Sequence, residues 1–375
     1  MRRILLFLLL ASFASQAAVK NENASLRNEV QHAIDKGLAS LEKTQGTNGT
    51  WNADQPAVTA LVVTAFNGEP SGRFQKQSPE FLKKSYAYLL SCAKPDGSIY
   101  NKKELLNYNT AVATMAFVTA KNPEYRKTIV AARNFLAGSQ NDFGEHGKVD
   151  NVFDGGVGYG SHYDHSDLNN TLLALEAMYY SKDLARDTDA KDLDWQAAIH
   201  FLQSCQNLPG INKEKWASDD PQNKGGFIYY PEKSMAGETT NANGRVAFRS
   251  YGSASYAGLL SYIYADLKPN DPRVKAVAGW LDRNFTLEEN PGMGPQGLYY
   301  YYHTMAKALT LSGVNTIETS DGKKINWREQ LALKLINLQK ADGSWANENG
   351  RWWEKDPALV TSYAVIALEL IHRGL

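Results

Sequence analysis

The stretch LINLQKADGSW, from Leu335 to Trp345, decides the fold because the chain repeats it. Earlier copies are SLEKTQGTNGTW, YLLSCAKPDGSIY, NFLAGSQNDFG and HFLQSCQNLPG, which begin at Ser40, Tyr88, Asn134 and His200, and a fainter one begins at Trp280. In each copy the end of an amphipathic helix runs into a polar turn that contains glycine, in most copies after a glutamine. Glycine permits the left-handed backbone that ends a helix, and glutamine can bond the carbonyls left open there. A unit that recurs in this way indicates a repeat architecture.

A second helix, rich in Ala, Leu, Val and Ser, follows each turn. These helices are predicted over residues 55–66, 107–120, 167–180, 251–266, 302–313 and 358–372. Because this apolar set cannot all face water, we expect it to form an inner ring that the amphipathic set wraps. The prediction is an all-α fold, an (α/α)6 toroid of six helical hairpins. An open solenoid is the alternative, since repeat chains need not close.

The first residues of the chain have the layout of a secretory signal peptide. Arg2 and Arg3 precede an apolar run over residues 4–10, and small residues follow near Ala17. We therefore assign residues 1–18 to a signal peptide and residues 19–375 to a single toroid domain, and we expect a secreted or periplasmic protein.

Composition excludes several partners. The chain has 40 basic and 40 acidic side chains, with no basic run that would suit nucleic acid. No later stretch approaches the roughly 18 apolar residues that cross a membrane, so we expect no integral membrane segment after signal removal. Two cysteines, Cys92 and Cys205, are too few for a disulfide framework. We expect a monomer.

The turn pattern, glutamine followed by Gly-x-Trp, resembles the aromatic-glycine repeat of the prenyltransferase and squalene-cyclase superfamily. The copies that carry it best are Gln45, Gly49 and Trp51, and Gln339, Gly343 and Trp345. The resemblance covers nearly all of the mature chain and implies the α/α toroid of that superfamily. It is weak evidence for function, because folds of this kind also process glycans or only bind ligands.

Two functional motifs of that superfamily are altered here. DLNNT, from Asp167 to Thr171, resembles the cyclase sequence Asp-x-Asp-Asp-Thr, but Asn169 stands where the resemblance places the proton-donating acid. YYYYHT resembles the zinc-binding histidine segment of protein prenyltransferases at His303, but Arg249 and Tyr251 occupy the other two ligand positions. The resemblance therefore implies neither squalene cyclisation nor zinc-dependent prenyl transfer. We expect no metal and no cofactor.

Polar segments precede three inner helices, and a closed ring brings them to one mouth. Catalytic candidates there are Asp164, His165, Tyr251 and His303. Candidates for ligand binding are Tyr159, His162, Asp167, Asn169, Arg249, Tyr256, Tyr300 and Trp352. The HYDH sequence over residues 162–165 suits a metal or a general base, or only local hydrogen bonds in a glycine-rich loop.

We expect a small-molecule, lipid or glycan ligand at the mouth of the central cavity, bound through an anionic or hydroxyl-rich group because helix N-termini carry partial positive charge. Two alternatives stay open. One is a polysaccharide lyase or hydrolase that uses His, Tyr and Arg, and the other is a non-catalytic binding module. A deep aromatic pocket favours a terpenoid-like ligand, and an open cleft with Arg, His and Asp favours sugars.

Overall fold

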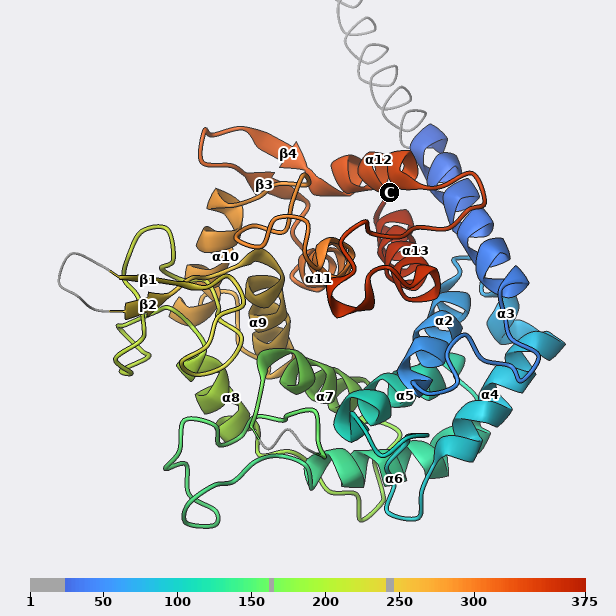
Figure 1. Cartoon of the computed structure of the whole chain (residues 1–375), viewed down its shortest axis with the longest axis horizontal. Coiled ribbons are helices and arrows are strands. Elements are labelled where there is room, and N and C mark those ends of the chain that lie inside the picture. The colour runs from blue at the N-terminus through green and yellow to red at the C-terminus, as the bar shows by residue number, and fades with distance from the viewer. Residues whose placement is uncertain (1–23, 162–164, 241–245) are drawn as a thin grey trace, which may run out of the picture.

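The computed structural model describes residues 24–161, 165–240 and 246–375. In this part of the chain, six helices form an inner ring in which each helix packs on the next and α13 packs on α2 (Figure 1). They are α2 (Pro56–Gly68), α5 (Leu106–Ala120), α7 (Leu168–Ser181), α9 (Gly252–Tyr264), α11 (Leu298–Leu311) and α13 (Pro357–Gly374). The ring is closed, so the solenoid alternative is excluded.

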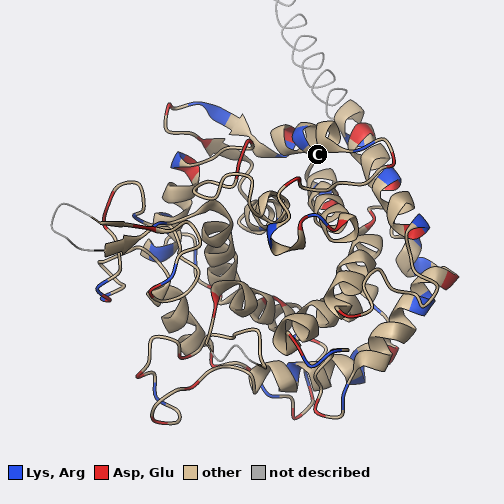
Figure 2. Ribbon diagram, in the orientation of Figure 1, with Lys and Arg blue, Asp and Glu red and all other residues tan. Residues whose placement is uncertain are grey.

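A second set of helices wraps this ring. It comprises a helix over residues 24–43 together with α4 (Glu80–Cys92), α6 (Arg126–Ala137), α8 (Trp195–Ser204), α10 (Pro272–Arg283) and α12 (Trp327–Leu338). Figure 2 shows the charged residues mainly on these outer helices and on loops. The predicted all-α toroid is confirmed. The largest difference in a helix start is at α11, which begins at Leu298, not at Tyr302, so that the run of tyrosines is helical.

The remaining elements are short. They are α3 (Arg73–Lys76), η1 (Pro123–Tyr125), η2 (Arg351–Trp353) and two antiparallel hairpins, β1 (Glu238–Thr240) with β2 (Val246–Phe248) and β3 (Thr316–Glu318) with β4 (Lys324–Asn326). Within the described ranges, every helix is too short or too polar to cross a membrane. Cys92 and Cys205 are buried and free.

In the four repeats that have it, the glutamine ties its own turn to the outer helix of the next repeat. Gln339 Nε2 donates to the Gly343 carbonyl at 3.0 Å and to the Ala33 carbonyl, on the first outer helix, at 2.9 Å. This turn therefore helps to close the ring. Equivalent pairs of bonds run from Gln45 to Gly49 and Phe81, from Gln140 to Gly155 and Asp194, and from Gln206 to Gly225 and Arg273.

The turn glycine lies against the next outer helix. Gly343 has a φ of 87°, and a Cβ there would lie 2.3 Å from the Lys36 carbonyl oxygen, so only glycine fits. In the copies that begin at Asn134 and His200, the bonds from glutamine identify this glycine as Gly155 and Gly225. The nearer glycines quoted with the sequence, Gly144 and Gly210, are not the turn glycines, because those two turns contain long insertions.

A hydroxyl on five of the six inner helices fixes the turn from the other side. The Val157 N–H donates to Thr171 Oγ1 at 2.9 Å. The same bond joins Trp51 to Thr59, Ile99 to Thr110, Phe227 to Ser255 and Trp345 to Thr361. Thr171, which the chain shares with the cyclase motif, therefore has a structural role common to most repeats.

Neighbouring inner helices run in the same direction. Asn109, near the start of α5, accepts a bond from the Ala57 N–H at the start of α2, and Asn67, near the end of α2, donates to the Ala116 carbonyl near the end of α5. The inner helices therefore all start at one end of the barrel, which we call the mouth. They all end at the other, which we call the far end.

Candidate functional site

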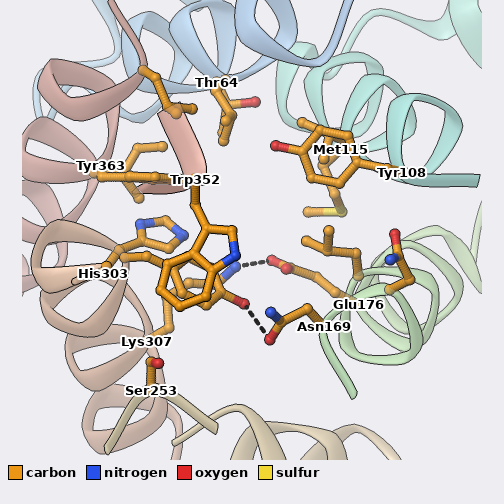
Figure 3. Close-up of a pocket in the computed structure, with 18 of the residues that line it drawn as sticks. Thr64, Tyr108, Met115, Asn169, Glu176, Ser253, His303, Lys307, Trp352 and Tyr363 are labelled. Atoms are coloured by element: carbon orange, nitrogen blue, oxygen red, sulfur yellow. Dashed lines mark hydrogen bonds and ion pairs between the residues drawn. The ribbon is translucent and has the colours of Figure 1, made fainter. Parts of the chain in front are cut away.

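A cavity of about 810 Å³ lies inside the inner ring (Figure 3). Its lining follows one face of each helix from the mouth toward the far end. On α7 this face carries Asn169, Leu173, Glu176 and Tyr180, which are spaced three or four residues apart. The faces of α11 and α13 are lined in the same way by Tyr300, His303, Lys307 and Thr310, and by Leu359, Tyr363, Ile366 and Glu369. The cavity is therefore elongated along the barrel.

Aromatic rings dominate the walls. The tyrosines that line the cavity are Tyr108, Tyr159, Tyr180, Tyr229, Tyr230, Tyr251, Tyr300 and Tyr363. Burial raises the pKa of the Tyr300 and Tyr363 phenols well above the ordinary value, so both stay neutral. Aliphatic side chains such as Leu61, Val112 and Met115 fill much of the remaining wall. The surface presented to a ligand is apolar and uncharged over most of its length.

Polar groups at the mouth are largely bonded to one another. Tyr300 Oη donates to Asn169 Oδ1 at 3.2 Å, which joins α11 to α7 (Figure 3). Trp352 lies across this opening, and the Arg351 guanidinium stacks 4.5 Å from the centroid of the Trp352 ring. Trp352 and Trp353 are 41% and 47% exposed, so the ring pair is accessible at the rim.

Side chains of the protein already cap the helix starts at the mouth. Asp167 caps α7, Asn290 accepts from the Ser253 N–H of α9, Glu354 accepts from the Tyr300 N–H of α11, and Asp356 caps α13. Because three of these caps are carboxyl groups, little of the partial positive charge is left for a ligand. The expectation that these N-termini attract an anionic ligand is therefore not supported.

Asp167 is fully buried. Burial raises the pKa of Asp167 to about 6, although bonds from the Asn170 backbone and side chain and from the Asn169 N–H favour the ionised form. The side chain bonds to the first turn of α7 and to the Tyr229 side chain, and Asp167 does not itself line the cavity. Asp167 is therefore a helix cap.

An ion pair crosses the middle of the cavity. Lys307 Nζ of α11 pairs with Glu176 Oε1 of α7, and both side chains are mostly buried. His303 lies one turn before Lys307 and is 6% exposed, with its ring centroid 5.0 Å from that of Tyr363. Burial and the Lys307 charge hold the pKa of His303 well below its usual range, so the imidazole is neutral. Its Nδ1 has no partner among the described residues.

At the far end, the lining includes Gly68, Thr310, Glu369 and Arg373. Glu369 is 2% exposed, and burial raises the pKa of its carboxyl group well above the ordinary value. Within the described part of the chain, neither Glu369 Oε1 nor Thr310 Oγ1 has a hydrogen-bond partner. This end of the cavity therefore keeps a neutral acid and a hydroxyl without partners.

The structure brings together most of the residues predicted from sequence. Those that line the cavity are Tyr159, His165, Asn169, Tyr251, Tyr300, His303 and Trp352. Three others do not line it. Asp167 is a cap, and Arg249 is exposed on the loop after β2. Tyr256, a residue of α9, is buried against Tyr301 and is absent from the cavity lining. His162 and Asp164, with most of the HYDH sequence, lie outside the described residues.

Five charged residues in the described lining were not predicted, and two of them, Glu354 and Arg373, lie near helix ends. Glu176, Lys307 and Glu369 each stand alone inside an otherwise apolar helix, in the sequences TLLALEAM, TMAKAL and AVIALELI. A single charge on a helix that must be buried was the signal that could have identified them. As for metals, no three His, Cys, Asp or Glu side chains converge in the part of the chain that the structure describes.

No family model matches the sequence, and no curated protein matches it. Solved structures of the type II terpene cyclase MstE from Scytonema do match the fold. Its apo structure is 13% identical, with a TM-score of 0.57 over 93% of this chain and 99% of that chain. A variant in complex with the substrate geranylgeranyl dihydroxybenzoate is 13% identical, with a TM-score of 0.57 over 94% of this chain and 100% of that chain. A variant in complex with the product merosterolic acid A is 12% identical, with a TM-score of 0.54 over 93% of this chain and 98% of that chain. The chain therefore has the terpenoid cyclase and prenyltransferase-like fold that its turns resemble, and identity this low shows the fold alone.

Proposed function

We propose that this protein binds one elongated, largely apolar molecule of the terpenoid or long-chain lipid class in the central cavity. The observation that carries the proposal is a cavity of about 810 Å³, inside a closed ring, whose walls are neutral aromatic and aliphatic side chains. Its size lies within the range of small-molecule sites. The fold neighbour MstE binds a geranylgeranyl compound in a toroid of the same kind, which supports the ligand class.

The charges that line the cavity argue against two other ligands. Among the described residues that line the cavity, Lys307 is paired with Glu176 and Arg373 lies at the far end, so this part of the chain offers no cluster of cations to a diphosphate. Glycan recognition needs many polar partners, whereas most of the polar groups here are bonded within the protein. An apolar ligand needs neither cations nor free polar groups, since it only contacts the walls.

The residues also favour binding without acid-initiated cyclisation. Asn169 stands at the position that resembles the cyclase acid, and an amide does not protonate an alkene. Burial raises the pKa of the Glu354 and Glu369 carboxyl groups, which makes each a weaker acid than an ordinary carboxyl. We therefore propose a secreted or periplasmic lipid-binding protein that encloses its ligand in the central cavity of the toroid, with residues 1–18 as its signal peptide.

Native mass spectrometry of the mature protein tests this proposal. We expect one equivalent of the branched C20 hydrocarbon phytane or its alcohol phytanol to bind, and no binding of maltohexaose. Leu173→Trp places an indole in the cavity and should abolish binding, whereas Leu333→Trp, the same change on the outer surface of α12, should not. Binding of maltohexaose alone, or equal phytane binding by both variants, would contradict the proposal.

A further inference from the structure

The far end of the cavity contains a carboxyl group with one oxygen atom that has no hydrogen-bond partner in the described part of the chain. Glu369 lies on α13, lines the cavity and is 2% exposed, and its Oε1 bonds to no described residue. The other oxygen packs against Gly68 at the end of α2, where a Cβ would lie 1.9 Å from Oε2. Only the absence of a side chain at Gly68 leaves room for this carboxyl group.

The neighbouring charged groups are engaged elsewhere. Glu69 accepts bonds from the N–H and hydroxyl of Ser71 and from Gln31. Arg373 donates to the Gly68 carbonyl and forms no ion pair with Glu369. Burial outweighs the attraction of Arg373, with Glu69 adding to the upward shift, so the pKa of Glu369 lies well above its ordinary value and the group is a neutral acid.

A second polar atom lies near the same end. Thr310 is one residue before the last residue of α11, and α11 packs on α13. Thr310 lines the cavity, and its Oγ1 is buried and has no partner in the described chain. A buried polar atom left without a partner is destabilising. A ligand group that bonds to these atoms removes that destabilisation, and one that is apolar does not.

The chemistry of the two groups selects the ligand atom. A protonated carboxyl group offers one O–H donor and one carbonyl acceptor, and a threonine hydroxyl also does both. An alcohol complements this set, since its oxygen accepts and its hydrogen donates. A carboxylate or phosphate brings a negative charge near Glu69 and loses its hydration on entering the buried end of the cavity, so both are disfavoured.

Distance along the barrel sets the ligand's length. Glu369 lies ten residues beyond Leu359, the first lining residue of α13, which is about 15 Å along a helix. A short alcohol cannot reach from the mouth to the far end and fill the aromatic section between them. A long-chain alcohol can do both, with its chain against the tyrosines and its hydroxyl group at the far end.

We propose that Glu369, with Thr310, forms a hydroxyl-binding site at the far end, and that the ligand is a long-chain isoprenoid or fatty alcohol that enters with its hydroxyl group leading. This inference rests on the proposed function, because it assigns one end of the molecule that the cavity holds. The Glu176–Lys307 pair lies between the two ends and is already satisfied, so it contacts the chain without selecting the head group.

Three probes with one carbon skeleton test the assignment, namely phytanol, phytane and phytanic acid, with dissociation constants from isothermal titration. Wild type should bind phytanol roughly tenfold more tightly than phytane, as one or two hydrogen bonds allow, and should bind phytanic acid less tightly than phytanol. Glu369→Gln, which keeps a neutral donor and acceptor, should retain the preference for phytanol. Glu369→Leu should lose most of it, and Thr310→Val part of it.

Controls separate binding from folding. Glu369→Leu removes an unpartnered buried polar group, so its melting temperature should equal or exceed that of wild type. Glu329→Leu, on the outer surface of α12, should leave all three affinities unchanged. Equal binding of phytane and phytanol by wild type, a preference that survives in Glu369→Leu, or tightest binding of phytanic acid would overturn this inference and leave the cavity function standing. Failure of wild type to bind any of the three would overturn the proposed function itself.

Discussion

The mouth and the far end of the cavity are opposites in how their polar groups are used. At the mouth, Asn169 bonds to Tyr300, Asp167 caps α7 and Glu354 caps α11. At the far end, Glu369 and Thr310 each keep an atom without a partner in the described chain. The mouth has more polar residues and leaves one of their atoms, Asn170 Oδ1, without a partner in the described chain, whereas the far end has fewer polar residues and leaves two such atoms. A dense polar segment therefore marks the rim of this barrel, and a sparse one marks where a ligand gains a hydrogen bond.

The largest expected effect lies between the two ends. Lys307→Met leaves Glu176 buried without its partner, and we expect a loss of roughly 3–5 kcal/mol in the free energy of unfolding. The double variant Glu176→Leu with Lys307→Met should recover most of that loss, because no unpaired charge remains. Urea unfolding measures both. If the single variant is as stable as wild type, the Glu176–Lys307 pair is hydrated and the cavity contains more water than we describe.

The second-largest effect is the pH dependence of stability that Asp167 causes at the mouth. The pKa of Asp167 is about 6 in the folded protein and about 4 in an unfolded chain. The folded state holds the proton of Asp167 more tightly than the unfolded chain does. Asp167 therefore stabilises the fold fully below pH 4, and this contribution declines as pH rises through 6, by about 3 kcal/mol in all. Asp167→Asn keeps a good cap and removes the ionisation.

The free energy of unfolding of Asp167→Asn relative to wild type should therefore increase between pH 4 and pH 7. Glu369→Gln should change in the same direction, since burial raises the pKa of that carboxyl group too. A difference for Asp167→Asn that stays constant across this range would show that the cap is ionised throughout.

A smaller effect is expected where Gly68 touches Glu369. Gly68→Ala brings a methyl group to within 1.9 Å of the present position of Oε2, so the carboxyl group must move. We expect a loss of about 1–3 kcal/mol in stability and a weaker preference for phytanol over phytane. Gly279→Ala on the outer helix α10, where the nearest atom is 3.4 Å away, is the matched control and should be neutral or stabilising.

The smallest effect is expected at the rim. Trp352 is exposed and has a φ of 55°, a left-handed conformation that costs a non-glycine residue about 1–2 kcal/mol. Trp352→Gly relieves this strain and removes the ring across the mouth, so stability should change by less than about 1 kcal/mol. Phytanol should dissociate faster, as stopped-flow measurements would show, while its preference over phytane stays unchanged. A lost preference would place the hydroxyl group at the mouth.

Much of the architecture was predictable because the repeats are local. Gln339, Gly343 and Trp345 act within one turn, and the same spacing at Gln45 indicates the same turn. The exceptions were the turns after Gln140 and Gln206, where insertions separate glutamine from its glycine. Only the hydrogen bonds to Gly155 and Gly225 identify the true partner. Local sequence cannot show which glycine packs on the next helix.

The site was predictable only in part, and for a related reason. Polar residues before an inner helix are visible in sequence, so Asn169, Tyr300 and Trp352 were predicted to lie near the cavity. Whether such a residue faces the cavity or caps a helix depends on neighbours far along the chain, as Asp167 shows. Glu369 was missed because its importance comes from Gly68, some 300 residues away, which makes room for it without bonding to it.

The most direct test of the account is a crystal structure of the mature protein with phytanol. We predict a single molecule along the axis of the inner ring, with its chain against Tyr300, His303 and Tyr363 and its oxygen within hydrogen-bond distance of Glu369. Phytanol bound outside the ring, or inside it with the hydroxyl group at Asn169, would contradict the account.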